Sequence, residues 1–220
     1  MGHDFEWERK AIVGDLWKRG YIKSEAIKKA MLKVKRELFV PKELIQDSYS
    51  DTPLPIPGNV TISAPHMHSI MLSASKLKSG DKVLEIGAGS GILLAYTKEV
   101  VGTKGKVFGI EITKETFEFA KENLKKSGYE KKIRLILGDG SLGLPKFAPF
   151  DKIISSASCP EIPRPWIDQL KEGGILITPI GPSHARQELL YIEKTKTGKI
   201  IKKDVGGVVF VNLKGKHGWK

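Results

Sequence analysis

Hydrophobic residues in the first third of the chain recur three or four positions apart, a spacing typical of amphipathic helices. Two helices are expected within residues 4–40, and Gly20 ends the first of them. A long loop is expected at 47–60, because this stretch is rich in proline and glycine. A third helix is expected at about 65–76, and its expected buried side consists of Met67, Ile70, Met71 and Ala74.

After residue 80 short apolar runs alternate with helical periods. Such alternation implies a parallel, doubly wound sheet. The tail predicts a β-hairpin around the turn TKTG, followed by a further strand in GGVVFVNL (206–213). The strands of the sheet are expected at 81–89, 106–112, 132–140, 150–158 and 175–181, and the helices at 90–101, 113–128 and 162–174.

The predicted fold is therefore α/β: a doubly wound, mostly parallel, Rossmann-like sheet with helices on both faces. An N-terminal helical extension and a C-terminal β extension complete it. We expect a single domain over 1–220, with the extension and its loop at 1–60, the ligand-binding core at 61–181 and the hairpin and tail at 182–220.

Charge and apolar content limit the classes of partner. Lysine and arginine exceed aspartate and glutamate by 37 − 25 = 12, which could indicate nucleic acid. Arginine, the preferred reader of phosphates and bases, occurs only at 9, 19, 36, 134, 164 and 186, and scattered lysines are typical of a solvated surface. No apolar run approaches the roughly 20 residues of a membrane span. We expect neither nucleic acid nor membrane as partner.

Cysteine and histidine usage indicates neither a disulfide framework nor a metal site. Cys159 is the only cysteine, which excludes a disulfide within the chain and favours a reducing, cytoplasmic location. His66 and His68, two positions apart, point to different faces of a helix. No metal is expected, and the protein is expected to be a monomer.

A glycine-rich turn follows the first strand of the alternation and reads Gly87-Ala88-Gly89-Ser90-Gly91. A turn of this kind lets a ligand approach the backbone closely and offers free N–H groups at the start of the next helix. Glu111 ends the next strand, 20 residues after Gly91, where a carboxylate can accept both hydroxyls of a ribose.

The ligand predicted by this turn is S-adenosylmethionine (SAM). The spacing G-x-G-x-G differs from the dinucleotide spacing G-x-G-x-x-G. Glu85, inside the strand, places a carboxylate beside the turn, which suits an ammonium group better than a pyrophosphate. Asp139 and Gly140, at the end of the following strand, are placed for the edge of an adenine.

Several stretches outside this turn carry a more specific pattern. They are RELFVP (36–41), YSDTPLPIPGN (49–59), TISAPHM (61–67), GDGSLGLP (138–145), APFDKIISSAS (148–158) and VNLKGKHGW (211–219). With VLEIGAGSG (83–91) they make the chain resemble the protein-L-isoaspartate O-methyltransferase family over roughly 34–219.

The resemblance implies SAM-dependent methylation of the free α-carboxylate of L-isoaspartyl residues in proteins and peptides. The ester then closes to a succinimide, which can reopen to aspartate. It also implies a methyltransferase sheet with a rearranged order of the last strands, and Ser63 as the active-site residue. The expected cofactor site comprises Glu85, Gly87, Ala88, Gly89, Ser90, Gly91, Glu111, Ile112, Asp139, Gly140 and His68; the expected substrate site comprises Asp51, Val60, Thr61, Ile62 and Ser63.

Some positions depart from common family variants. Pro57 and Val60 replace residues that are frequently Gly and Gln or Ala, and Lys214 and His217 stand where Thr and Gln are more usual. The roles of Lys214, His217, His66 and Cys159 are left open.

The chemistry explains a serine at a helix start. A carboxylate with a pKa near 4 is already ionised at pH 7, so methyl transfer to it needs no general base. Catalysis then depends on aligning and desolvating the carboxylate. The Ser63 hydroxyl can donate to it, helix N–H groups add a favourable dipole, and Pro65 suits the first helical position. The alternative is that Ser63 is only a helix cap.

Two other functions remain open from the sequence. The first is an RNA or DNA methyltransferase; residues 155–163 read SSASCPEIP instead of the N/D-PP-Y/F typical of exocyclic-amine enzymes, but ring-nitrogen methylation of RNA stays possible. The second is a non-catalytic scaffold, which an intact set of Glu85, Glu111 and Asp139 disfavours.

Overall fold

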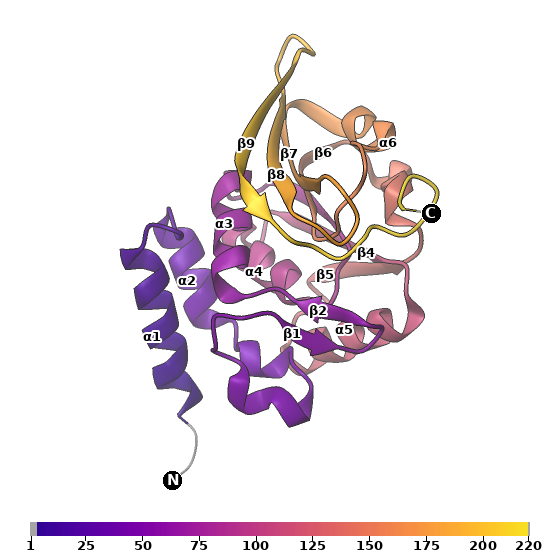
Figure 1. Ribbon diagram of the computed structural model, residues 1–220. Helices are drawn as coiled ribbons and strands as arrows, with labels where there is room; N and C mark the ends of the chain where they lie inside the picture. The colour runs from indigo at the N-terminus through magenta and orange to yellow at the C-terminus, as the bar shows by residue number, and fades with distance from the viewer. Residues whose placement is uncertain (1–3, 220) are drawn as a thin grey trace.

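The computed structural model describes residues 4–219 and contains one seven-stranded sheet in the order β5-β4-β3-β6-β7-β8-β9 (Figure 1). The first five strands in this order run parallel, and β8 and β9 continue the sheet antiparallel. This confirms the predicted mostly parallel sheet with a C-terminal β extension. The strands are β3 (Lys82–Ile86), β4 (Lys106–Glu111), β5 (Ile133–Leu137), β6 (Phe150–Ser155), β7 (Leu170–Ile180), β8 (Gln187–Lys194) and β9 (Ile200–Val208).

Alternate residues of the strands face two separate cores. Val83 packs with the longer helices on one face, whereas its neighbour Leu84 packs on the other face with Trp166 of α6. Three-residue 3₁₀ turns and the C-terminal tail complete the second face. The helices are α1 (Phe5–Lys18), α2 (Glu25–Lys33), α3 (Pro65–Ser75), α4 (Ile92–Val101), α5 (Lys114–Lys126) and α6 (Arg164–Asp168).

The segment predicted as a loop at 47–60 is more ordered than expected. It contains a 3₁₀ helix that ends at Asp47, and β1 (Leu54–Ile56) pairs antiparallel with β2 (Val60–Ile62). The turn between them needs left-handed backbone at Gly58 and Asn59, with φ of 92° and 57°. A short hairpin therefore leads the chain into α3.

Two predictions for the C-terminal third are wrong. The helix expected at 162–174 is reduced to the single turn of α6, because Phe150 pairs with Leu170 and draws the chain into β7. The further strand expected in 206–213 does not form: β9 absorbs its start, and beyond Val208 the tail makes one isolated bridge, between Asn212 and Ser158. Periodicity could not reveal these pairings between distant segments.

The helix at 65–76 forms as predicted, but it is rotated about its axis. Met71 is buried, whereas Met67, Ile70 and Ala74 are only partly buried. His68 and Ser69 are buried instead, at 4% and 0% exposure. The His68 ring contacts the buried Arg36, and the Ser69 hydroxyl donates to the His66 carbonyl at 2.7 Å, so both polar side chains have partners inside.

Candidate functional site

The glycine turn joins β3 to α4 where β4 and β6 flank β3 on opposite sides. Chain connections diverge at this point, and open α/β sheets bind ligands there. Gly87, Gly89 and Gly91 all have positive φ, at 77°, 54° and 86°. Residues with a side chain rarely adopt this conformation, which explains the G-x-G-x-G spacing.

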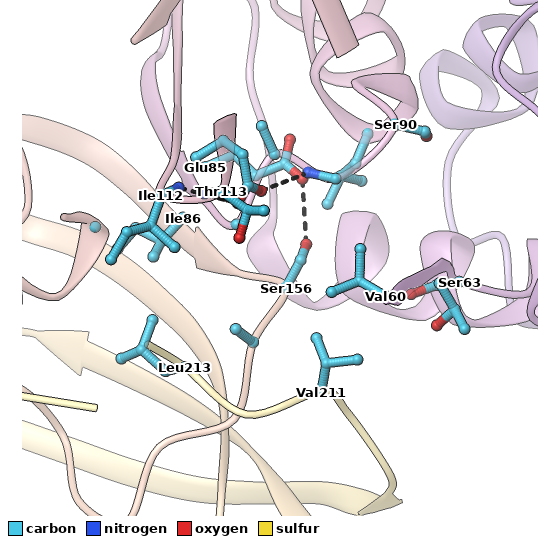
Figure 2. Close-up of a pocket in the computed structure, with 18 of the residues that line it drawn as sticks. Val60, Ser63, Glu85, Ile86, Ser90, Ile112, Thr113, Ser156, Val211 and Leu213 are labelled. Atoms are coloured by element: carbon cyan, nitrogen blue, oxygen red, sulfur yellow. Dashed lines mark hydrogen bonds between the residues drawn. The ribbon is translucent and has the colours of Figure 1, made fainter. Parts of the chain in front are cut away.

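A cavity, which we call the inner cavity, lies at this edge of the sheet (Figure 2). Figure 2 shows Glu85, Ile112 and Thr113 on one side, with Val211 and Leu213 of the tail opposite them. Most of the predicted site residues line it: Val60, Thr61, Ile62, Ser63, His68, Glu85, Gly87, Ala88, Gly89, Ser90, Glu111, Ile112 and Gly140.

Glu85 is buried at 3% exposure and lines the inner cavity. Its Oε1 accepts a hydrogen bond from the Ser156 hydroxyl at 3.1 Å, whereas Oε2 has no partner within residues 4–219. Burial raises the pKa of Glu85 well above its ordinary value. The hydrogen bond from Ser156 lowers this pKa in part, and the negative charge of Glu111 raises it further. An unpaired buried acceptor of this kind fits an ammonium group.

Glu111 fixes the shape of the glycine turn. Its Oε2 accepts from the backbone N–H of Gly89 at 3.2 Å, and its Oε1 accepts from the N–H groups of Ile112 and Thr113 at 2.9 and 3.0 Å. Each carboxylate oxygen has two lone pairs, so one lone pair, on Oε2, remains to accept from a ligand hydroxyl.

Gly91 and Asp139, both predicted for the cofactor site, do not line the inner cavity. The Asp139 carboxylate instead accepts from the backbone N–H groups of Ser141 and Lys216, each at 2.8 Å, and so ties the C-terminal tail to the turn after β5. Gly140 does line the cavity, and a Cβ there would lie 2.7 Å from Ile86.

Ser63 is not the cap of α3. Ala64 occupies the N-cap position and Pro65, as expected, opens the helix, so Ser63 lies one residue before the cap. The Ser63 hydroxyl has no hydrogen-bond partner within residues 4–219, while its carbonyl accepts from Arg36 at 2.9 Å. The hydroxyl is therefore available to a ligand.

A second hollow, which we call the outer groove, adjoins the inner cavity. Ser63, Val60 and Thr61 line both, as do Ser156 and the tail residues 211–214. The groove also reaches His66, Arg186 and Trp219. The loop, the hairpin and the tail thus enclose a passage from solvent to the glycine turn.

Asp51 lines neither hollow, contrary to its predicted place in the substrate site. Its Oδ1 accepts from the backbone N–H of His66 at 2.9 Å and contacts Nδ1 of the same ring at 2.8 Å. Asp51 therefore caps α3 from the loop. Asp51 also occupies a backbone N–H group of α3 that we expected to be free for a ligand. The negative charge of Asp51 weakens the attraction of the helix dipole for a bound anion.

Sequence reasoning missed Ser156, Ala157 and the wall formed by 211–214. Ser156 and Ala157 follow β6, the neighbour of β3, so the rule that ligands bind at the carboxyl ends of parallel strands could have found them. The tail was known only as the motif VNLKGKHGW (211–219), in which the role of Lys214 was left open.

The structure places Cys159, Lys214 and His217, whose roles the sequence left open. Cys159 is buried, and burial raises the pKa of its thiol to about 12. Lys214 lines both hollows, and the His217 N–H donates to Ser141 Oγ at 3.0 Å. Within residues 4–219 no three metal-ligating side chains cluster, and none of the helices there has the length and apolar character of a membrane span.

The sheet order, the glycine turn and the acids at the ends of β3 and β4 define the class of Rossmann-like nucleoside-binding methyltransferase folds. Residues 7–218 match the family model described as Protein-L-isoaspartate(D-aspartate) O-methyltransferase (PCMT), and the chain belongs to this family.

Relatives agree over nearly the whole chain. Proteins named protein-L-isoaspartate O-methyltransferase from Hyperthermus butylicus and Pyrococcus horikoshii are 48% and 49% identical to it, covering 99% and 98% of this chain and 94% and 96% of their own. A crystal structure titled as a putative enzyme of the same name from Plasmodium falciparum, in complex with S-adenosyl-L-homocysteine, superposes with a TM-score of 0.84 at 32% identity, covering 94% of this chain and 98% of its own.

Proposed function

We propose that the chain transfers a methyl group from SAM to the free α-carboxylate of L-isoaspartyl residues in damaged proteins and peptides. The ester formed then closes to a succinimide and starts repair to aspartate. Family membership supports the reaction, and S-adenosyl-L-homocysteine bound to the similar Plasmodium falciparum protein supports the cofactor.

The residues at the glycine turn suit SAM. The unpaired Glu85 Oε2 is placed to accept from an ammonium group, and Glu111 Oε2 has a remaining lone pair for a ribose hydroxyl. When bound, SAM supplies an electrophilic methyl group on its sulfonium. We assign cofactor binding to Glu85, Gly87, Ala88, Gly89, Ser90, Gly91, Glu111, Ile112, Asp139, Gly140 and His68, with Gly91 shaping the turn and Asp139 acting through the tail that it holds.

The free hydroxyl of Ser63 is the observation that carries the proposal. It lies where the inner cavity meets the outer groove and has no partner within residues 4–219. We propose that it donates to the substrate carboxylate and aligns it, while Val60, Thr61 and Ile62 line the approach and exclude water. Asp51 contributes indirectly by holding the loop against α3.

Methyl transfer to a carboxylate needs no general base from the protein. The nucleophile is ionised at neutral pH, so no residue has to remove a proton. This fits a cavity in which the one lining histidine of residues 4–219, His68, is a weak base: burial first, and then the Arg36 charge, hold the pKa of His68 well below its ordinary value.

A paired-peptide assay tests the proposal. The purified protein with labelled SAM is expected to methylate an isoaspartyl peptide and to leave the same peptide with aspartate unlabelled. Equal labelling of both peptides, or of neither, would contradict it. A parallel incubation with tRNA tests the alternative of ring-nitrogen methylation, for which substrate-level labelling of RNA would be required.

We further propose that the protein works as a monomer in the cytoplasm. The lone, buried Cys159 supports a location that needs no disulfide within the chain. Light scattering of the purified protein tests the oligomeric state.

A further inference from the structure

Arg36 is a buried guanidinium that stands behind the wall of the inner cavity without lining it. It is 1% exposed and opens the 3₁₀ turn Arg36–Leu38 that follows α2. Its Nε donates to the Ser48 carbonyl at 2.6 Å and its Nη2 to the Ser63 carbonyl at 2.9 Å. Its Nη1 lies 3.4 Å from Nδ1 of His68. One side chain thus holds the loop, the segment before α3, and α3 itself.

This guanidinium has no counter-ion of its own. Within residues 4–219 no carboxylate oxygen lies within 4.0 Å of its nitrogens. The adjacent Glu37 pairs with Arg9 at 3.2 Å, and Asp51 is held by His66 and Arg19. Burial of a charge without a counter-ion is unfavourable. Burial lowers the pKa of Arg36, yet an arginine in a protein stays protonated, so a positive charge remains behind the cavity wall.

The contact with Arg36 decides which nitrogen of His68 carries the proton. All guanidinium nitrogens are donors, so Nδ1 of His68 has to accept. Because the ring is neutral, its proton then lies on Nε2. The ring lines the inner cavity, and Nε2 has no hydrogen-bond partner within residues 4–219. The wall therefore presents an N–H donor backed by a positive charge.

We propose that Arg36 is a positioning residue of this site, which fixes His68 as the Nε2–H tautomer and holds the Ser63 backbone so that both residues turn donors towards a bound carboxylate. The inference deepens the proposed function and rests on it for the identity of the ligands. Two carboxylates are available there: that of the methionine part of the cofactor and that of the isoaspartyl residue. The same donors and the same charge suit either one.

Nitrogen-15 NMR of histidine-labelled protein tests the tautomer directly, since a protonated ring nitrogen and one with a free lone pair have very different shifts. In the wild type, His68 is expected as a neutral ring protonated on Nε2. In Arg36→Met the tautomer is expected to become mixed. Arg9→Met is the matched control: it removes another buried arginine that contacts neither His68 nor Ser63, and it is expected to leave the tautomer unchanged.

Binding measurements distinguish the two carboxylates. If the cofactor carboxylate is recognised, Arg36→Met weakens S-adenosylhomocysteine about tenfold or more in calorimetry but leaves 5′-methylthioadenosine, which lacks the amino-acid part, unchanged. If the substrate carboxylate is recognised, the KM for the isoaspartyl peptide at saturating SAM rises by a similar factor. Arg36→Lys keeps the positive charge but lacks the planar set of guanidinium donors. Its affinity for the recognised ligand is therefore expected to lie between those of the wild type and Arg36→Met.

A wild-type His68 protonated on Nδ1 or on both nitrogens at neutral pH would overturn the inference. So would an Arg36→Met protein with unchanged tautomer and unchanged affinities. If Arg36→Met does not fold, the wild-type spectrum and Arg36→Lys still decide. The spectra and the calorimetry need no turnover, so a protein that binds S-adenosylhomocysteine but methylates no isoaspartyl peptide would refute the proposed reaction while leaving this inference testable.

Discussion

The two walls of the inner cavity are built in different ways. One consists of the glycine turn and Glu111, which lie at the ends of adjacent parallel strands and are shaped by their own backbone hydrogen bonds. The other consists of the hairpin before α3 and the tail at 211–214, segments about 150 residues apart in the chain. The first wall is a local property of the sequence, and the second exists only through tertiary contacts. We propose that the first wall binds most of the cofactor, assisted by His68 of α3 and by the tail that Asp139 holds, and that the peptide binds at the second wall.

Removal of the Ser63 hydroxyl is expected to have the largest effect and to fall on the second wall. Ser63→Ala should lower kcat for the isoaspartyl peptide by about 100- to 1,000-fold, as for the loss of one aligned donor. The affinity for S-adenosylhomocysteine should stay within about twofold, because the cofactor residues are untouched. Steady-state kinetics and calorimetry measure the two quantities.

Ser50→Ala is the control, since Ser50 is exposed and lines neither hollow. Normal turnover by Ser63→Ala would mean that the serine has no part in aligning the substrate.

Glu111→Ala is expected to produce the opposite pattern. It removes a charged acceptor that also holds the Gly89 N–H. Hydrogen bonds to charged groups contribute about 1.5–3 kcal/mol, so the affinity for S-adenosylhomocysteine should fall by about 10- to 100-fold. Turnover at saturating SAM should stay near that of the wild type.

Glu115→Ala, on the exposed first turn of α5, is the matched control. A large loss of kcat at saturating SAM in Glu111→Ala would contradict the division of labour between the walls.

Glu85→Gln should separate binding from stability. The folded pKa of Glu85 is raised, so the unfolded chain loses this proton first, and the stability of the free protein falls as the pH rises above the ordinary value of 4.5. The neutral amide removes that loss. The melting temperature of Glu85→Gln at pH 7 should therefore be a few degrees higher than that of the wild type, since each kcal/mol of stability corresponds to about 2–4 °C.

The affinity of the same variant for S-adenosylhomocysteine should fall about tenfold, because the ammonium loses an anionic partner. Thermal melts at pH 4 and pH 7, with and without the ligand, provide the comparison. A variant that is less stable at pH 7 would show that Glu85 is ionised and satisfied in the free protein.

Asp51→Ala is expected to have the smallest effect. It removes the cap of α3, which should cost about 1 kcal/mol of stability and lower the melting temperature by about 2–4 °C. Asp47→Ala, in the same loop without such a contact, is the control. If Asp51→Ala abolished turnover without changing the melting temperature, Asp51 would contact substrate after all.

How much the sequence could predict follows the same division between the walls. The parallel strands, α4, α5 and the turn at Gly87–Gly91 were predicted because periodicity, glycine spacing and strand ends are local signals. The helix expected at 162–174 failed because Leu170 pairs with Phe150, and no local pattern carries that contact.

The site was predicted least well where distant segments meet. Asp51 was expected at the substrate, yet its partner is the backbone of His66, 15 residues further on. Ser156 was missed although it follows β6, the parallel neighbour of β3, whereas the residues 211–214 reach the turn only through the folding of the tail. Arg36 was known as part of a motif, but its contact with His68 requires the packed structure.

Hydrogen exchange of the backbone amides tests the two-wall account most directly. S-adenosylhomocysteine alone is expected to protect 87–92 and 111–113. Addition of the isoaspartyl peptide to this complex is expected to protect 60–64 and 211–214 as well, whereas the matching aspartyl peptide is not. Equal protection by both peptides, or peptide-dependent protection confined to other parts of the chain, would contradict the account.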